Sequence, residues 1–416
     1  YWIGQVSFGT VPALLALGVL VVGTGIAWRV LDEPVDYRAG LAPVAVFVAA
    51  FALLLWFRAL DPAVHPIGGE KFLDFGLVKS LLRAEALPPE DMWFAGEPVA
   101  YYYGGHLLAA MLALLTDTPA RYAYTLSLAT VYATLVTATY GLAGAIAGAH
   151  DVDHRRAGAL GAFFVGIASN LQSPLRFLRW LAPDAADPVL LEIVGEPEGL
   201  SRGLAAFSYW DASRVIDGTI NEFPLFAFVN GDLHAHMVST PFLLLTVALL
   251  FCYARTPPAD RRHRLGLLFG AVPPLAGLLV VVNTWSFPTV AGLTGLTVAL
   301  ASADPLTLIG RQSGGDWRGE LTRPVAGLLA AAGVATIGAL WTLPFLLGPA
   351  SGRSVAFLPD RSALGPLLVV HGAFLGLFGA YVARQWGDRR LALGGVGAVV
   401  ILALALDRTV TAGGVA

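Results

Sequence analysis

The stretch "LAPVAVFVAAFALLLWFRAL" (residues 41–60) decides the fold. It contains twenty residues, of which only Arg58 is charged. A helix rises 1.5 Å per residue, so twenty residues reach about 30 Å, the thickness of the hydrocarbon core of a bilayer. The stretch therefore predicts a membrane-spanning helix.

Similar apolar runs recur along the chain, which has 416 residues, 56% of them hydrophobic and 13% charged. The runs lie at 8–30, 41–60, 121–148, 157–171, 237–253, 265–282, 323–342, 366–385 and 391–407, with shorter ones at 104–116 and 287–302. They are continuous, whereas the strands of a membrane barrel alternate in polarity. We expect an all-α polytopic bundle of about nine to eleven spans, forming a single integral membrane domain over 1–416.

The charged loops predict an orientation in a multi-pass plasma-membrane protein. Arginine clusters at 150–156, 255–264 and 384–390 are expected to face the cytoplasm. Two long loops, 61–103 and 172–235, are rich in acids and aromatic residues and are expected on the extracytoplasmic face. They reach the same face only if 104–116 is a half-helix, which we favour, or if the run 121–148 bends.

Composition excludes some classes of function. The single cysteine, Cys252, rules out an intramolecular disulfide and zinc sites built on paired thiolates. A net charge of −3 gives no reason to expect nucleic acid as a partner. The informative residues are therefore the polar ones in the long loops.

The first polar segment is "EKFLDFGLVKSLL" (residues 70–82). Its apolar residues recur at helical spacing, which predicts a helix lying in the membrane interface. Glu70 and Asp74 are four residues apart, so both carboxylates project from one face. Such a pair can bind a cation, or one member can act as a base. The alternative is a pair of solvated acids that favour the start of the helix.

The segment "PPEDMWFAGEPVAYYYGGH" (residues 88–106) follows. Tyr101, Tyr102 and Tyr103 are candidates for substrate binding, or they form an aromatic belt at the headgroup level. His106 is a further binding candidate at the start of the next apolar run. The alternative is a packed histidine.

The second polar segment is "YWDASRVIDGTINEFPLFAFVNGDLHAHMVSTPFLLL" (residues 209–245). Ionisable groups directly before a spanning helix are costly unless they are paired or used. A helix that starts at Asp232 would place Asp232 and His236 on one face, whereas an extended segment would place His234 with them. Either geometry allows two of them to hold a metal or a phosphate. The alternative is an ordinary helix cap with interfacial histidines.

Two shorter elements add candidates. "NTWSFPT" (283–289) is a polar break between apolar runs, where Asn283 and Trp285 line the expected pocket or form a plain turn. Arg353, in "GPASGRSVAFLPD" (348–360), would bind a lipid phosphate or anchor at the headgroups.

Taken together, "GEKFLDF", "WFAGEPVAYYYGGH", "SRVIDGTINEFPLFAFVNGDLHAH" and "NTWSFPT" resemble the membrane protein family named for its Tyr-Tyr-Tyr motif, found in archaea and Chloroflexi. The resemblance covers about residues 50 to 300. That family in turn resembles the GT-C superfamily of polytopic glycosyltransferases, which carry acids in the first extracytoplasmic loop. Those enzymes take sugars from polyprenyl- or dolichyl-phosphate carriers.

The resemblance implies a sugar transferase whose partners are a lipid-phosphate sugar donor and membrane lipids. Glu70 or Asp74 would act as the base, and Asp232, His234 and His236 would hold a divalent cation (Mg, Mn or Zn) or bind the sugar. The remaining expected binding residues are Arg202, Arg214, Asn221, Glu222 and Arg353, with arginine on the donor phosphate. The alternatives are a polytopic transporter and a lipid-binding or assembly protein without catalysis.

Overall fold

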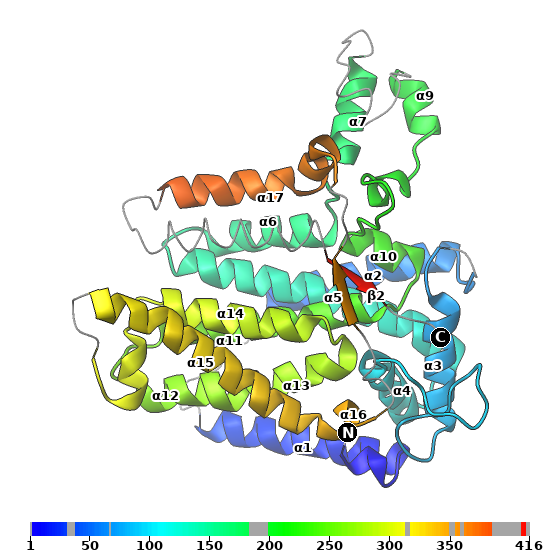
Figure 1. The fold of residues 1–416 in the computed structure, drawn as a ribbon. Helices are drawn as coiled ribbons and strands as arrows, with labels where there is room; N and C mark the ends of the chain where they lie inside the picture. The colour runs from blue at the N-terminus through cyan, green and yellow to red at the C-terminus, as the bar shows by residue number, and fades with distance from the viewer. Residues whose placement is uncertain are drawn as a thin grey trace. The chain divides into compact units, whose positions relative to one another are not determined.

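The computed structural model describes residues 2–30, 38–65, 68–182, 199–312, 317–348, 354–357, 362–384 and 409–412 (Figure 1). The chain divides into two compact units. Unit one comprises Tyr1–Gly166 and Phe228–Gly352, and unit two comprises Ile167–Ala227 and Arg353–Ala416. The single membrane domain expected from the sequence stays a prediction.

Unit one holds most of the helices. They are η1 (Ile3–Gln5), α1 (Thr10–Val30), α2 (Leu41–Leu60), α3 (Lys71–Arg83), α4 (Gly104–Thr116), α5 (Ala120–Gly148), α6 (His154–Gly166), α11 (Ala235–Arg255), α12 (Arg261–Leu265), the π-helical turn η3 (Gly266–Ala271), α13 (Val272–Val282), α14 (Ser286–Leu300), η4 (Pro305–Ile309), α15 (Trp317–Trp341) and α16 (Leu343–Leu346). Helix α10 (Pro224–Asn230) crosses the boundary between the units.

Unit two contains α7 (Gln172–Leu181), α9 (Leu200–Ala205), η2 (Asp211–Ser213) and α17 (Leu364–Arg384). Its two short strands, β1 (Ser354–Phe357) and β2 (Thr409–Ala412), pair antiparallel. The apolar run expected at 391–407 lies outside the described residues.

Among the described residues, seven helical segments are long and apolar enough to cross a membrane. They are Thr10–Arg29, Leu41–Leu60, Ala120–Gly148, Ala235–Arg255, Arg261–Val282, Leu321–Trp341 and Leu364–Arg384. Two shorter apolar helices, α4 and α14, accompany them. The prediction of a polytopic helical membrane protein is confirmed.

Helix α4 is too short to span a bilayer alone. Its 13 residues reach about 20 Å, well under the ~30 Å of the hydrocarbon core. This length fits the expected half-helix at 104–116. Helix α5 runs without interruption from Ala120 to Gly148, and the alternative of a bend in the run 121–148 stays a prediction.

Small residues let the helices of unit one approach closely. A Cβ at Gly277 of α13 would lie 2.7 Å from the carbonyl oxygen of Gly338 in α15. A Cβ at Gly327 of α15 would lie 2.5 Å from the carbonyl oxygen of Gly295 in α14. Glycine at these positions allows the backbone contact that drives helix association in a bilayer, where no hydrophobic force acts between helices.

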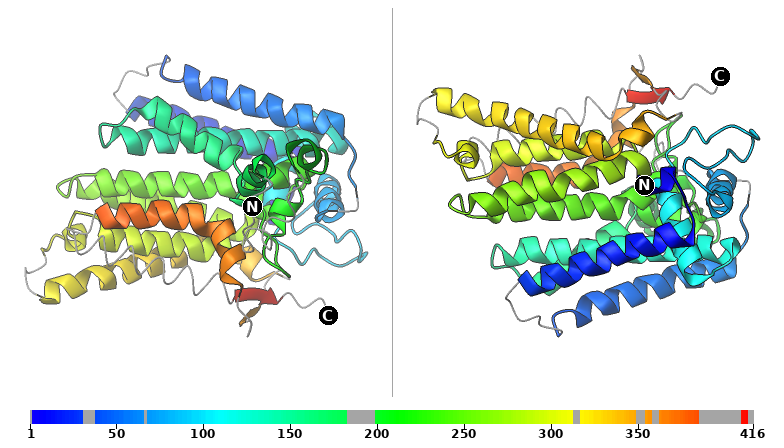
Figure 2. Two further views of the ribbon diagram at one scale, coloured as in Figure 1. Left: turned by 90° about the horizontal axis from the view of Figure 1, so that it is seen from above. Right: turned by 90° about the horizontal axis from the view of Figure 1, so that it is seen from below.

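Helix α3 runs across the ends of the long helices of unit one, while α12 lies at their opposite ends (Figures 1 and 2). Its inner face packs Leu77 and Leu81 into a core that includes Tyr103, Val281 and Phe345. This placement agrees with the expected interfacial helix. It also brings the start of α3 next to the start of α11.

Candidate functional site

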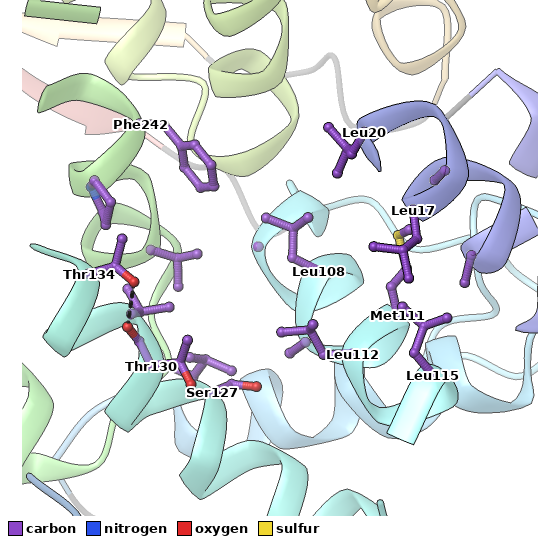
Figure 3. A pocket seen from close by; sticks show the side chains of 18 of the residues that line it. Leu17, Leu20, Leu108, Met111, Leu112, Leu115, Ser127, Thr130, Thr134 and Phe242 are labelled. Atoms are coloured by element: carbon purple, nitrogen blue, oxygen red, sulfur yellow. Dashed lines mark hydrogen bonds between the residues drawn. The ribbon is translucent and has the colours of Figure 1, made fainter. Parts of the chain in front are cut away.

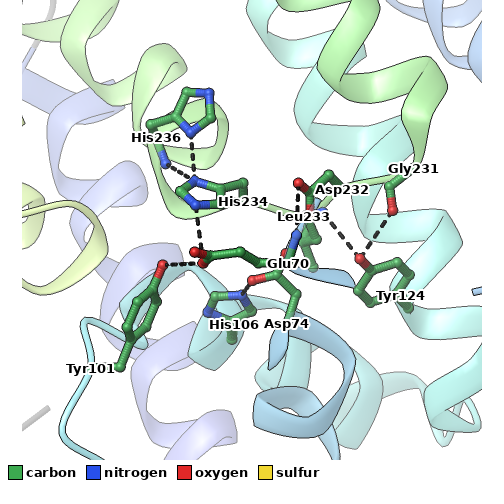
Figure 4. Close-up of polar contacts among 10 residues, drawn as sticks. All are labelled: Glu70, Asp74, Tyr101, His106, Tyr124, Gly231, Asp232, Leu233, His234 and His236. Atoms are coloured by element: carbon green, nitrogen blue, oxygen red, sulfur yellow. Dashed lines mark hydrogen bonds and ion pairs between the residues drawn. The ribbon is translucent and has the colours of Figure 1, made fainter. Parts of the chain in front are cut away.

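The two polar segments meet at the end of unit one, although they lie 162 residues apart in the chain (Figure 4). The backbone N–H of Glu70 donates to Asp232 Oδ2 at 3.3 Å. The Nε2 atom of His234 lies 3.2 Å from Glu70 Oε2. The acids of the first loop and the Asp-Leu-His segment therefore form one cluster.

Glycine permits this approach on both sides. Gly69 has φ +133°, and a Cβ there would overlap the Asp232 carboxylate. Gly231 has φ +80°, and a Cβ there would lie 2.7 Å from Arg58 Nη1. Both backbone conformations are ones that L side chains rarely adopt. The side-chain amide of Asn230 also donates to the Gly68 carbonyl, which ties the two loops together.

Tyr124 of α5 holds the second segment in place. Its hydroxyl donates to the Gly231 carbonyl at 3.0 Å and accepts from the Leu233 N–H at 3.1 Å. Residues 232–234 are non-helical, and α11 begins at Ala235 with His234 as its cap. Asp232 and His234 therefore both reach the cluster, as the extended alternative requires, and His236 lies in the first turn of α11.

Glu70 is the accessible acid of the cluster. Its Oε2 atom accepts from the Tyr101 hydroxyl at 3.0 Å and lies close to His234 Nε2. Its side chain is nevertheless 49% exposed. A molecule arriving from solvent or from the membrane surface can therefore reach the Glu70 carboxylate.

Asp74 is fully buried and takes a different role. Its Oδ1 atom lies 2.8 Å from His106 Nε2, and both side chains are 0% exposed. The Asp74 and Asp232 carboxyl groups lie close enough for each to shift the pKa of the other. Asp74 Oδ2 and Asp232 Oδ1 are both buried, and neither atom has a hydrogen-bond partner. Two neighbouring buried carboxyl groups repel each other when both are ionised, so the pair favours the state with one bound proton.

The pKa values follow from this burial. Burial raises the pKa of Asp74 to about 6, against a smaller lowering by its hydrogen bond with Asp232. Burial also raises the pKa of Asp232, to about 8, and the contact with Asp74 acts in the same direction. The pair is therefore an acid with one bound proton near neutral pH.

Two buried cations stand beside the acids. Arg58, at the end of α2, is 4% exposed and donates through Nη2 to the Ala63 carbonyl at 3.0 Å. Lys71 is 6% exposed. Burial lowers its pKa, nearby Asp232 opposes that change, and Arg58 reinforces it. The sequence interpretation missed both, although an arginine in the last turn of a spanning helix is a signal in itself.

The histidines extend a hydrogen-bonded chain from Tyr101 through Glu70. His234 Nδ1 lies 2.5 Å from His236 Nδ1, so one proton bridges the two rings. Burial lowers the pKa of His234, but Glu70, Asp74 and Asp232 together outweigh burial and raise it. His234 Nδ1 accepts from the His236 N–H, so the proton of the ring lies on Nε2, where it can donate to Glu70.

The expected divalent cation stays a prediction. In the part of the chain that the structure describes, no three His, Cys, Asp or Glu side chains form a group that could hold a metal ion. Asp232 accepts from the Glu70 backbone, and His234 bonds Glu70 on one side and His236 on the other. This donor set does not fit a cation.

The other predicted residues of unit one divide between the cluster and the core. Tyr102 and Tyr103 are 8% and 1% exposed and pack in the core beneath α3, whereas the Tyr101 hydroxyl donates to Glu70. Asn283 is buried and donates to Ser286 Oγ at 3.0 Å, before α14. Trp285 is the residue that precedes α14.

The remaining candidates belong to unit two. Arg202 is exposed. Arg214 stacks on Trp210, 4.2 Å from the ring centre, and donates to Ser213. Asn221 accepts from the Ile216 N–H at 2.9 Å. Glu222 is half-buried, and Arg353 lies outside the described residues. Their roles in binding stay predictions.

Comparison with known proteins gives the family and no activity. A sequence model of a family described as uncharacterized membrane proteins (DUF2298) matches residues 1–415. No curated protein and no solved structure matches the chain. Because the match covers nearly every residue, the chain belongs to the DUF2298 family of uncharacterized membrane proteins.

Proposed function

We propose that this protein is a membrane glycosyltransferase of the GT-C type. It transfers a sugar from a polyprenyl- or dolichyl-phosphate donor to an acceptor hydroxyl on the extracytoplasmic face. The observation that carries the proposal is the Glu70 carboxylate, half-exposed at the end of the bundle and bonded to Tyr101 and His234. The resemblance of the loop motifs to the Tyr-Tyr-Tyr-motif family supports the same reading.

Exposure selects Glu70 over Asp74 as the base. A general base must come within hydrogen-bond distance of the hydroxyl that it deprotonates. Glu70 meets this requirement because half of its side chain is exposed, whereas Asp74 is enclosed by His106 and Asp232. Asp74 and Asp232 instead position Glu70, since Asp232 accepts from its backbone N–H.

The reaction balances with one proton acceptor. Glu70 takes the proton of the acceptor hydroxyl as the acceptor oxygen bonds to the anomeric carbon. The bond between that carbon and the phosphate oxygen breaks, and its electron pair leaves with the lipid phosphate. Half of the Glu70 side chain is exposed, so the proton then passes to water, which restores the carboxylate, while His234 Nε2 stays 3.2 Å from Glu70 Oε2 as a hydrogen-bond donor.

Position in the membrane favours sugar transfer over transport. Transporters place their ionisable residues near the bilayer midplane, on broken helices. Here Glu70, Asp74 and Asp232 gather at the ends of the long helices of unit one (Figure 4). A reaction between a lipid-bound donor and a water-facing acceptor requires this depth.

The test is sugar transfer by the full chain in proteoliposomes. Radiolabelled hexosyl polyprenyl phosphates are the donors, and membranes from cells lacking the gene supply the acceptor. Glu70→Gln should lower transfer by about 10²–10⁴-fold, the usual contribution of a general base. Glu97→Gln is the matched control, because Glu97 lies exposed in the same loop. Wild-type transfer by both Glu70→Gln and Asp74→Asn would refute the proposal.

A further inference from the structure

A cavity of about 500 Å³ lies inside unit one, between α1, α4, α5 and α11 (Figure 3). Its volume falls within the ~300–1,000 Å³ typical of ligand sites. The lining is almost entirely hydrocarbon and includes Leu17, Leu108, Leu112 and Phe242. Such a cavity among membrane-spanning helices suits a lipid chain.

The few hydroxyl groups of the lining do not change its character. Thr130 donates to the Leu126 carbonyl at 2.8 Å, and Thr134 donates to the Thr130 carbonyl at 2.7 Å. Both threonine hydroxyls are thus satisfied by the backbone of their own helix. The threonines offer the cavity no unsatisfied polar group.

The cavity adjoins the polar cluster. Leu233 lines it, and its chain neighbours Asp232 and His234 belong to the cluster. Gly105 lines it as well, directly before His106, which bonds Asp74. A molecule with its chain in the cavity would therefore have its polar end close to Glu70.

Helix α1 forms a thin outer wall. Only 6% of the apolar spanning segment of α1 is buried inside the protein, against 44% of that of α5. Leu17 and Leu20 line the cavity and are still 44% and 68% exposed. In Figure 2, right, α1 lies on the outside of the bundle. The cavity is therefore separated from the surrounding lipid by one loosely packed helix.

We propose that this cavity binds the polyprenyl chain of the sugar donor, which enters sideways from the bilayer past α1. The inference rests on the proposed function, because that function supplies a donor with a hydrocarbon chain and a polar end. The position of the cavity next to the cluster selects this occupant over the acyl chains of bulk lipid.

The first experiment locates the chain. A polyprenyl phosphate with a diazirine in its chain is photolysed with the full-length protein in phosphatidylglycerol vesicles, and labelled peptides are mapped. Label is expected on α1, α4, α5 and α11, with displacement by excess unlabelled polyprenyl phosphate. Label outside these helices overturns the inference. The inference is also overturned if a phosphatidylglycerol that carries a diazirine labels the same helices equally and excess polyprenyl phosphate does not displace it.

The second experiment fills the cavity. Leu17→Trp in α1 and Leu245→Trp in α11 place an indole in the lining. Leu14→Trp and Leu296→Trp are matched controls, because these leucines are exposed but line no part of the cavity. The lining variants should lower labelling at least fivefold and raise the KM for the donor, whereas the controls should match wild type. Two helices are used so that misfolding of one variant leaves the other decisive.

The outcomes separate this inference from the proposed function. If Glu70→Gln abolishes transfer while both lining variants keep wild-type labelling and KM, the function stands and the chain site is wrong. If the lining variants lose labelling while Glu70→Gln transfers sugar normally, the chain site stands and Glu70 is not the base.

Discussion

Burial divides the three acids of the cluster between two tasks. Asp74 and Asp232 form a buried pair whose pKa values are raised, and Glu70 faces outward with an accessible carboxylate. Arg58 and Lys71 stand close to the same acids and offset their charge. The same residue type therefore supplies both a fixed support and a reactive group.

The raised pKa of Asp74 predicts a pH-dependent stability. Asp74 binds its proton more tightly in the folded state, where its pKa is about 6, than in the unfolded state, where it is about 4. Its contribution is complete below about pH 4 and is lost as pH rises through about 6. Asp74→Asn should remove this pH-dependent loss of stability, which amounts to up to about 2–3 kcal/mol. Thermal unfolding in detergent across this pH interval measures it. A Tm difference between variant and wild type that stays constant across that interval would contradict the raised pKa of Asp74.

The close approach at Gly69 predicts a severe effect of one methyl group. Gly69→Ala would place its Cβ on the Asp232 carboxylate, so the loop must move. We expect a Tm clearly lower than that of Gly96→Ala and strongly reduced sugar transfer. Gly96→Ala is the control, because Gly96 has φ +83° with nothing within 4 Å and should cost only about 1–2 kcal/mol of strain. Equal Tm values for the two variants would argue against the contact.

Much of the cluster could be predicted from residue type. Ionisable residues beside a spanning helix are costly, and this signal found Glu70, Asp74, Asp232 and His234. It could not show which of the three consecutive tyrosines contacts the cluster, because residue type alone does not reveal that the Tyr101 hydroxyl bonds Glu70. Arg58 and Lys71 escaped notice because one ends an apolar run and the other starts an amphipathic helix.

Helices α3, α5 and α11 each fix one part of the site. The start of α3 presents Glu70 and Asp74, the start of α11 presents His234 and His236, and α5 joins them through Tyr124. The bounds of α3 follow from the spacing of its apolar residues. The start of α11 could not be predicted in the same way, because the sequence also allowed a helix that begins at Asp232. The Tyr124 contacts that favour the extended form come from a residue far away in the sequence.

The clamp from α5 predicts the effect of losing one hydroxyl. Tyr124→Phe leaves the Gly231 carbonyl and the Leu233 N–H without their buried partner, at about 1–3 kcal/mol for an unsatisfied group. Tm should fall, and sugar transfer should fall with it, because the Asp232 segment loosens. Tyr122→Phe on the same helix is the control, since Tyr122 is 55% exposed. A Tyr124→Phe protein as stable and active as that control would show that the clamp is dispensable.

The long helices of unit one separate two chemically different ends. The acid cluster and α3 lie at one end, and the arginine-rich α12 lies at the other (Figure 1). The apolar runs predicted the spanning helices well, because hydrocarbon selects directly for length and apolarity. Pairing of the acid loop with the start of α11 could not be predicted in this way, since it depends on contacts between segments far apart in the chain.

The two ends predict opposite accessibility in intact cells. In a Cys252→Ala background, Phe94→Cys should react with a membrane-impermeant maleimide, because residue 94 is 66% exposed in the acid loop. Arg262→Cys, in α12, should react only after permeabilisation, as expected for a cytoplasmic arginine cluster. The reverse labelling pattern would place the cluster on the cytoplasmic side.

A double-mutant cycle tests most directly whether two remote segments act as one catalytic unit. Glu70→Gln, His234→Gln and the double variant are compared by kcat/KM for sugar transfer, with Glu70→Gln combined with Tyr122→Phe as the uncoupled reference. Because His234 acts on the reaction through its hydrogen bond to Glu70, the double variant should lose no more activity than the worse single variant. Losses that simply multiply, as in the reference pair, would contradict a shared role for Glu70 and His234.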